Sequence, residues 1–382
     1  PIFIAINKIL FGDNYLISSV IIQIIVDSFT CVIIVLIAKN INKLIVWPAA
    51  ILSIFSLNMI IHSALILTDT LFLSVFTSLI YVTLLFYENK RIRDVFYIAL
   101  LLSLGIMIKP MLYFFAPILI LAVLYVLFFK VKHIKIRIIS IFILLSVLLG
   151  SVGSFLSYNY NNYGYSSLVS QGGTTALYWH VPLSYQFSKG DDRSFTIKRV
   201  RAKYDKKFQE TVDQQSLKNP FYISEIKMEI AKKEMLDLGF VNTTKAWFSG
   251  AVINMLAPSL SSNPLIVSME RPRFYDATGD TFIDKSINFL FQKDNRMYLY
   301  LMMPAILVTI ILRFFALSGL ISAIKSPGYD LSKIIILFTY LTYILAITGP
   351  IVGAARYRLP IEPILIIFSS IIFSRILTKF NK

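Results

Sequence analysis

Two arginines stand at the beginning of the last apolar segment of the chain. Arg356 and Arg358 lie in "GAARYRLPIEP", residues 353–363, between two long apolar runs. Pro360 disfavours helical backbone just before it, so the four preceding residues are predicted to be extended. Alternate side chains of an extended segment share a face, which would point both arginines one way and Tyr357 the other. The sequence therefore predicts an anion site at the N-terminus of the following helix. The alternative is that both arginines only anchor a helix end at lipid headgroups.

Two further charged residues stand where apolar segments begin. Lys109 precedes Pro110, and Asp69 lies in "LTDT", residues 67–70. A lysine near bilayer depth is costly unless it snorkels or pairs, so Lys109 is a candidate for binding the same kind of anion, with simple snorkelling as the alternative. Asp69 is a candidate catalytic or metal-binding acid, and an N-cap of the following helix is the alternative.

The composition of the chain is that of an integral membrane protein. Its 382 residues are 57% hydrophobic and only 15% charged, and its mean hydropathy is +0.71. Apolar stretches long enough to cross a bilayer recur along the chain. We expect about nine spans, because one stretch is long enough for two. The stretches are 15–38, 44–67, 71–87, 95–129, 138–157, 298–324, 334–351 and 361–377.

The positive charge of the chain, +16 overall, is distributed unevenly between the two sides of the membrane. If residues 39–43 face the cytoplasm, alternation of the spans places fourteen basic residues on that side and four in the short opposite connections. The positive-inside rule then fixes the orientation. Most of the charge therefore reflects topology, and no nucleic-acid partner is expected. The same alternation brings Asp69, Lys109, Arg356 and Arg358 to the external face.

A long polar segment separates two groups of predicted spans. Residues 158–297 contain no predicted span and carry only a small net positive charge. We therefore predict one external, mainly α domain between an N-terminal transmembrane module, 1–157, with about six spans, and a C-terminal module, 298–382, with about three. The fold class expected is an all-α polytopic membrane protein.

The external segment opens with a turn-rich loop. Gly172 and Gly173 in this loop permit close approach of another backbone, and with Gln171 they are candidate substrate-loop residues. Residues 196–238 then alternate apolar side chains with Lys and Glu at helical spacing, which predicts amphipathic helices.

Several polar residues lie inside the predicted spans. Gln23 and Asp27 are one helical turn apart, so we expect both to face protein rather than lipid. Arg313 lies deep in an apolar stretch, and either snorkelling or a shifted span can place it. No cluster has convincing metal-ligand spacing, although His62 shares a helical face with Asp69, and participation of a divalent metal stays open. The single cysteine, Cys31, excludes an internal disulfide.

The order of these features resembles the GT-C glycosyltransferases of the protein mannosyltransferase and aminoarabinose transferase type. The resemblance covers nearly the whole chain at the level of pattern, and "ARYRLPIEP" (355–363) carries it most specifically. The other matching segments are "PIFIAINKILFGDNYLISSVIIQIIVDSFT" (1–30), "ALILTDTLFLSVFTSLIYVTLLFY" (64–87), "ALLLSLGIMIKPMLYFFAP" (99–117) and "NNYGYSSLVSQGGTTALYW" (161–179).

This resemblance implies a function and roles for the candidate residues. The function is transfer of a sugar from a polyprenyl-phosphate carrier to a lipid, glycan or protein acceptor on the external or periplasmic face of a bacterial cytoplasmic membrane. By position, Asp69 resembles the second acidic site of the family. Lys109, Arg356 and Arg358, with Tyr357, resemble residues that hold the phosphate of the donor.

One feature of the family has no counterpart here. Its catalytic aspartate follows the first span, and this chain begins within or just after that loop, so the principal base is expected upstream of Pro1. Two other readings stay open, a transporter or flippase for an anionic lipid or solute, and a non-catalytic donor-binding subunit.

Overall fold

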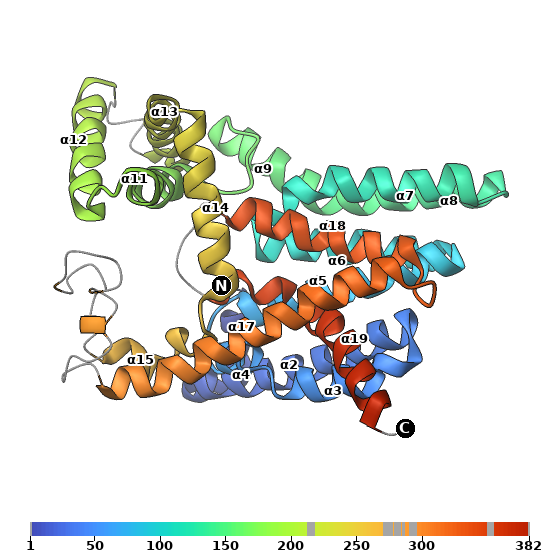
Figure 1. Ribbon diagram of the computed structural model, residues 1–382. Coiled ribbons are helices and arrows are strands. Elements are labelled where there is room, and N and C mark those ends of the chain that lie inside the picture. Colours follow the sequence, from blue (N-terminus) through green and yellow to red (C-terminus); the bar gives the residue numbers. More distant parts are fainter. Residues whose placement is uncertain are drawn as a thin grey trace. The chain divides into compact units, whose positions relative to one another are not determined.

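The computed structural model describes residues 2–211, 218–269, 278, 284, 287–289, 296–349 and 355–380. Within these ranges every regular element is a helix and no strand occurs (Figure 1). This confirms an all-α chain whose apolar helices are those of a multi-pass membrane protein.

Seven helices of the described residues are long and apolar enough to cross a membrane. An eighth span results if the bent pair Lys43–Ile54 and Leu57–Ser63, which meet at 46°, is taken as one broken span. Another apolar helix predicted from the sequence is α6 (Ile92–Ile108), which has 17 residues. The seven are Ile2–Ile41, Asp69–Asn89, Pro110–Lys130, Ile134–Tyr163, Met297–Lys325, Leu331–Thr348 and Leu359–Thr378.

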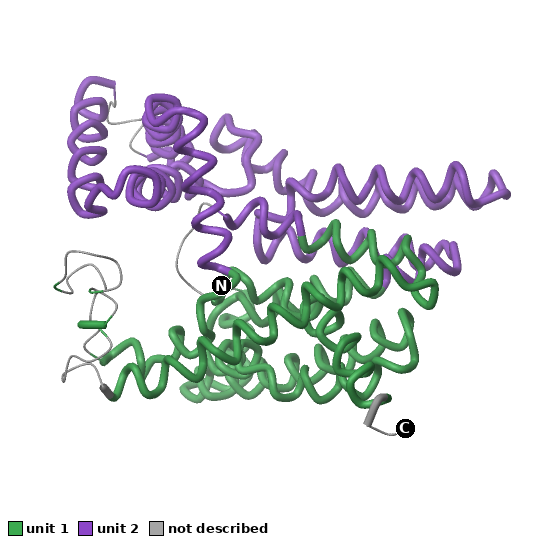
Figure 2. Tube along the Cα trace, in the orientation of Figure 1, with its two compact units in different colours: residues 1–81, 255–341, 354–382 green, residues 82–254, 342–353 purple. Residues whose placement is uncertain are grey.

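The chain forms two compact units, each assembled from separate stretches of sequence (Figure 2). Unit 1 contains Pro1–Tyr81, Met255–Leu341 and Ala354–Lys382, and unit 2 contains Val82–Asn254 and Thr342–Gly353. These units reflect contacts between helices rather than the side of the membrane. The division into 1–157, 158–297 and 298–382 therefore stays a prediction.

Unit 1 holds the two ends of the chain. Its helices pack around α19, whose candidate span is the most buried of the seven among the described residues. Helices and short 3-10 turns of this unit are α1 (Ile2–Phe11), η1 (Gly12–Asn14), α2 (Tyr15–Ile41), η2 (Lys43–Ile45), α3 (Val46–Ile54), α4 (Leu57–Ser63), the start of α5 (Asp69–Asn89), η7 (Ser259–Ser262), α15 (Pro264–Ser268), α17 (Arg296–Lys325), most of α18 (Leu331–Thr348), η10 (Ala355–Tyr357), η11 (Leu359–Ile361) and α19 (Glu362–Phe380).

Helices α17 and α19 approach each other closely because Gly319 has no side chain at the point where they meet. A Cβ atom on Gly319 would lie 1.8 Å from the carbonyl oxygen of Phe368. Small residues at such crossings allow two membrane helices to pack backbone against backbone. A hydrogen bond from Ser369 Oγ to Leu312 O, 3.1 Å, joins the same two helices. The contact fixes the position of α17 beside the start of α19.

Unit 2 combines apolar helices with residues 158–254 of the polar segment predicted to be external. Its elements are the end of α5, α6 (Ile92–Ile108), η3 (Pro110–Phe115), α7 (Ala116–Lys130), α8 (Ile134–Leu148), η4 (Leu149–Gly153), α9 (Ser154–Tyr163), α10 (Gly172–Thr175), η5 (Ala176–His180), α11 (Val181–Lys189), α12 (Arg193–Thr211), α13 (Pro220–Leu238), α14 (Phe240–Leu256) and the end of α18.

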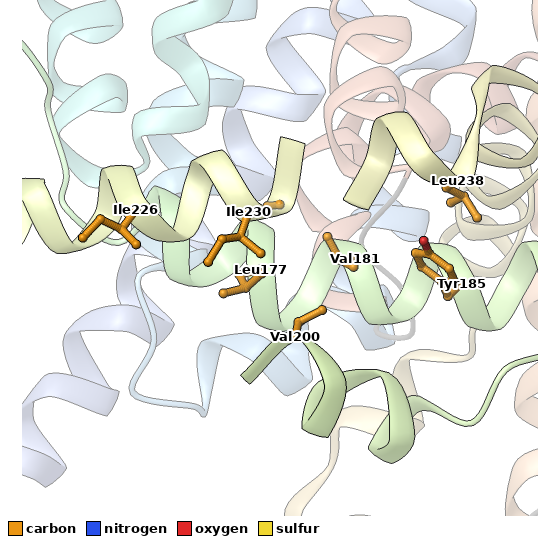
Figure 3. Close-up of a cluster of buried hydrophobic side chains, with 8 residues drawn as sticks. Leu177, Val181, Tyr185, Val200, Ile226, Ile230 and Leu238 are labelled. Carbon is orange, nitrogen blue, oxygen red and sulfur yellow. The ribbon is translucent and has the colours of Figure 1, made fainter. Parts of the chain in front are cut away.

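The polar part of unit 2 has its own apolar core. Side chains from η5, α11, α12 and α13 pack together in a buried cluster, labelled in Figure 3. The amphipathic helices expected over 196–238 are α12 and α13, and the apolar positions of α13 face this cluster. The cluster comprises Leu177, Val181, Tyr185, Val200, Ile226, Ile230, Ala231 and Leu238.

A buried carboxylate also joins α12 to α13. Glu234 of α13, 2% exposed, accepts hydrogen bonds from Arg199, at 2.8 Å, and from Lys203. Burial opposes ionisation of this carboxyl group, but the hydrogen bond from Lys203 and the charge of Arg199 outweigh burial and hold the pKa of Glu234 below its usual value.

The stability of this helix pair should therefore depend on pH. Because the folded pKa of Glu234 is depressed, its stabilising contribution is present above the unfolded value of about 4.3 and is lost as pH falls through the folded pKa. We expect Glu234→Gln to flatten the loss of thermal stability of the full chain between about pH 5 and pH 3. Glu229→Gln, on the same helix with a side chain 68% exposed, should follow the wild-type curve. An unchanged acid dependence in Glu234→Gln would contradict this role.

Candidate functional site

Asp69 and Arg356 form an ion pair in unit 1. Asp69 is the first residue of α5 and 1% exposed, and Arg356 lies in η10. Arg356 Nε lies 3.7 Å from Asp69 Oδ1, and the arginine side chain is 41% exposed. The guanidinium also lies over the ring of Tyr357, 5.5 Å from its centroid, which is within the range of a cation–π contact. A buried carboxylate therefore stands beside a cation that is accessible to a ligand.

Asp69 is the first residue of α5 rather than the N-cap residue that precedes the helix. Phe72 N donates to Thr68 O at 3.0 Å, so the residue before Asp69 supplies the first helical acceptor. An acidic side chain in the first turn is favoured by the helix dipole. The structure thus brings together two residues, Asp69 and Arg356, that the sequence placed on one face by alternation of spans.

The predicted extended conformation of residues 356–359 is wrong. They belong to two consecutive 3-10 turns, η10 and η11, and Arg358 has φ −83° and ψ −20°. Arg358 N donates to Ala355 O at 3.1 Å, and Ile361 N donates to Arg358 O at 2.9 Å. A 3-10 helix has three residues per turn, so residues two apart point in different directions. The two arginines therefore do not share a face.

Arg358 is turned into the protein, where it is 1% exposed. Its Nη1 atom donates to Met255 O at 3.0 Å and to Ala257 O at 2.8 Å, and its Nη2 atom donates to Ser259 Oγ at 3.3 Å. These bonds hold the end of α14 and the residues after it against the turns that precede α19. The assignment of Arg358 to a donor phosphate stays a prediction, and its observed partners are protein oxygens.

Glu362 lies at the centre of a buried charge cluster that sequence reasoning did not identify. Its carboxylate accepts from Arg313 Nη2 at 2.8 and 3.1 Å, from Arg358 Nε at 3.2 Å and from Asn58 Nδ2 at 3.2 Å. The charge of Arg313 is thus paired within unit 1, so its burial requires neither snorkelling nor a shifted span. Two signals were available, the spacing of four residues from Arg358 to Glu362 and opposite charges in two apolar segments.

Asn58 links this cluster to the turn that carries Arg356. Its Nδ2 atom also donates to Ala355 O at 3.3 Å, and its own carbonyl oxygen lies 2.8 Å from His62 Nδ1. Thr70 Oγ1 in turn donates to His62 O at 2.9 Å, beside Asp69. The positions of Asp69 and Arg356 are thus tied through α4 to the same buried network.

Lys109 belongs to unit 2, so its convergence with Asp69 and Arg356 stays a prediction. It follows α6 directly in the C-cap position, with φ −137° and ψ 104°, and its N donates to Gly105 O at 2.8 Å. This extended conformation is the one expected before Pro110. A 3-10 helix, η3, begins the next candidate span directly after it.

Gly173 allows two helices of unit 2 to touch. A Cβ atom there would lie 1.9 Å from Ser224 O of α13, and Gly173 N donates to Ser224 Oγ at 2.9 Å. Gln171 occupies the N-cap position of α10. A Cβ atom on Gly172 would have only the methyl group of Met228 near it, at 3.7 Å. The close backbone approach predicted here exists, and Ser224 occupies it. A substrate-loop role for these three residues stays a prediction.

The two adjacent glycines should respond differently to alanine. Gly173→Ala places a methyl group against backbone that cannot move freely, and we expect a loss of about 1–3 kcal/mol from overpacking. Gly172→Ala has room and replaces a flexible helical glycine, so it should be neutral or stabilising by up to about 1 kcal/mol. Thermal unfolding of the two purified variants measures the difference. Equal stability of the two would contradict the observed contact.

Two further predictions concern polar residues within the membrane helices. Gln23 and Asp27 of α2 are 0% and 8% exposed, and Gln23 Nε2 donates to Leu65 O at 2.7 Å, which confirms that both face protein.

No group of three His, Cys, Asp or Glu side chains that could hold a metal ion occurs in the described ranges. The structure assigns no metal ligand, and metal dependence stays a question for experiment.

The candidate site therefore consists of an accessible cation next to a buried carboxylate, supported by a buried charge cluster. Such a pair can bind an anion through the arginine and accept a proton through the carboxylate. No protein-family model, curated protein or solved structure matches this chain.

Proposed function

We propose that this protein is a membrane glycosyltransferase that moves a sugar from a polyprenyl-phosphate donor to an acceptor on the external face of the membrane. The observation that carries the proposal is the Asp69–Arg356 pair, with Nε and Oδ1 3.7 Å apart at the starts of two apolar segments. The proposal includes about nine spans, an external domain over 158–297 and a GT-C-like arrangement. It also includes the bacterial cytoplasmic membrane, with the active face external or periplasmic.

In this proposal each member of the pair has one task. An acceptor oxygen attacks the anomeric carbon of the sugar, and the bond from that carbon to the phosphate oxygen breaks. Asp69 takes the proton of the acceptor, and polyprenyl phosphate leaves with its negative charge next to Arg356. Lys109 stays a sequence-based candidate for binding the donor phosphate. The acceptor is a lipid, a glycan or a protein.

The supporting residues have positioning tasks. Arg358 and Glu362 fix the two turns before α19, so that Arg356 projects outward while Arg358 stays buried. Tyr357 supplies an aromatic face beneath the guanidinium of Arg356. This accounts for two arginines in one short motif, because one is available for a ligand and the other holds the backbone that presents it.

A transporter or flippase is the second candidate, and one observation favours it. The α3–α4 pair is bent by 46° at a short break, and broken helices near polar residues are common in transporter binding sites. A non-catalytic donor-binding subunit is the third candidate, carried over from the sequence.

Reconstitution of the full chain in proteoliposomes separates these functions. The donors are polyprenyl-phosphate-linked hexoses with a label in the sugar, and the acceptors are envelope lipids, glycans and peptides in separate reactions. A labelled product with a new glycosidic bond, together with released polyprenyl phosphate, is expected. Movement of the donor between leaflets without a new bond would instead make the protein a flippase. Saturable binding with neither outcome would make it a donor-binding subunit.

A further inference from the structure

A cavity of about 100 Å³ opens in unit 1 at the break between α3 and α4. Its polar lining consists of Ser56, Asn58, Arg313, Glu362 and Ser369, and the other lining residues are apolar side chains of α3, α4, α17, α19 and the break. The Asp69–Arg356 pair does not line it. At about 30 Å³ per water molecule, it has room for a small polar head group but not for a whole lipid.

Three residues of the polar lining carry atoms that could form hydrogen bonds but have no partner in the described part of the protein. Asn58 Oδ1, Ser56 Oγ and Arg313 Nε are all buried, and within the described part of the chain none of the three atoms has a hydrogen-bond partner. The Arg313 side chain is only 10% exposed, and Asn58 is 2% exposed. Buried polar atoms normally find partners in the protein, in water or in a ligand.

The orientation of the Asn58 amide follows from its neighbours. Its nitrogen donates to two acceptors, Ala355 O and Glu362 Oε2, so its oxygen must be the atom left over. The polar lining therefore offers one donor, from Arg313, one acceptor, from Asn58, and the Ser56 hydroxyl, which can donate or accept. A hydroxyl group matches this set, because it can accept hydrogen bonds and also donates one. A phosphate dianion has no hydrogen to donate to Asn58, and a phosphate in either ionised form would place its negative charge near the Glu362 carboxylate.

Three exposed apolar side chains that line the cavity indicate where its occupant comes from. Phe55, Leu57 and Val308 line it and are 74%, 48% and 48% exposed. They belong to helices with the composition of membrane spans or to the break between them. Large apolar side chains exposed on membrane helices contact acyl chains. The molecule that enters is therefore one with an apolar body.

We propose that this cavity binds the hydroxyl head group of a neutral membrane lipid such as a 1,2-diacylglycerol. The hydroxyl group accepts from Arg313 Nε and Ser56 Oγ and donates to Asn58 Oδ1, while the acyl chains lie along the exposed apolar side chains of the lining. The site is separate from the Asp69–Arg356 pair, and it stands whether or not the protein transfers sugars.

Photocrosslinking tests the lipid specificity in the full chain. The protein is reconstituted in phosphatidylcholine nanodiscs with a diacylglycerol that carries a diazirine in one acyl chain. Unlabelled dioleoylglycerol in excess should reduce capture on peptides from α3, α4, α17 and α19 by at least about fivefold, and loss of one hydrogen bond should weaken the affinity of a competitor about fivefold. Its 3-O-methyl ether, dioleoyl phosphatidate and free glycerol should each reduce capture by less than about twofold. Equal competition by the ether, or stronger competition by the phosphatidate or glycerol, would overturn the proposal.

Variants test the location of the site. Val308→Trp places a larger side chain in the lining and should reduce capture by at least about fivefold. Leu307→Trp, on the same helix but outside the lining, should leave capture within about twofold of the wild-type value. Ser56→Ala removes one open hydroxyl with almost no change of volume and should weaken competition by dioleoylglycerol severalfold. If Val308→Trp does not fold, Ser56→Ala alone decides. Wild-type capture and competition in the folded variants would rule out this cavity.

Discussion

Glu362→Gln should destabilise the full chain by about 3–5 kcal/mol, the usual cost of removing one partner from a buried ion pair. The carboxylate lies between two arginine side chains that are 10% and 1% exposed, Arg313 and Arg358. Without its negative charge, both guanidiniums remain buried with no opposite charge between them. Because folded proteins are stable by only about 5–15 kcal/mol, this loss should be visible as a large fall in the thermal midpoint or in the yield of monodisperse protein.

A matched substitution and a double variant distinguish charge from shape in this experiment. Glu229→Gln removes the same charge from a pair with Lys207 whose glutamate is 68% exposed, and it should cost less than about 1 kcal/mol. Adding Arg313→Gln to Glu362→Gln removes one of the two uncompensated charges and should recover part of the stability. A Glu362→Gln protein as stable as the wild type, or a double variant less stable than the single one, would contradict the central role of this carboxylate.

The features predicted correctly from the sequence are those that depend on local pattern. Gln23 and Asp27 stand one turn apart in an apolar helix, so burial against protein was the consequence of lipid being unable to solvate them. The helices α12 and α13 follow from apolar residues at helical spacing, and Ile226 and Ile230 are buried as that spacing requires. Each of these inferences uses one segment and the solvent around it.

The features that were missed depend on contacts between distant segments. The turns before α19 are 3-10 rather than extended because Arg358 reaches the carbonyl oxygens of Met255 and Ala257, about a hundred residues earlier. The pairing of Arg313 with Glu362 likewise joins α17 to α19. Residues of opposite charge in apolar segments predict that a pair exists, but which charges pair depends on how the helices are arranged.

The distinction between the two arginines leads to different expectations for their replacement. Arg358→Ala removes the donor to Met255 O and Ala257 O and one of the two guanidiniums that pair with Glu362, so it should lower stability as well as any activity. Arg356 is 41% exposed and pairs at 3.7 Å, so its loss should change thermal stability by less than about 1 kcal/mol. Stability measurements on the two variants therefore separate the structural arginine from the arginine proposed to bind a ligand before any substrate is known.

Arg356→Ala should reduce sugar transfer by about 10²–10³-fold, the usual cost of removing one preorganised charge from a developing anion. If the guanidinium stabilises the departing phosphate, the loss lies mainly in kcat at saturating donor, whereas a role in donor binding alone raises KM and leaves kcat unchanged. Arg356→Lys should recover part of the rate because it restores the charge without the planar fork. Arg201→Ala, an exposed arginine on α12, should transfer at the wild-type rate. Asp69→Asn should lose about 10²–10⁴-fold if its carboxylate accepts the proton. Normal transfer by folded Arg356→Ala would remove Arg356 from the reaction and leave its pairing with Asp69 as a structural contact.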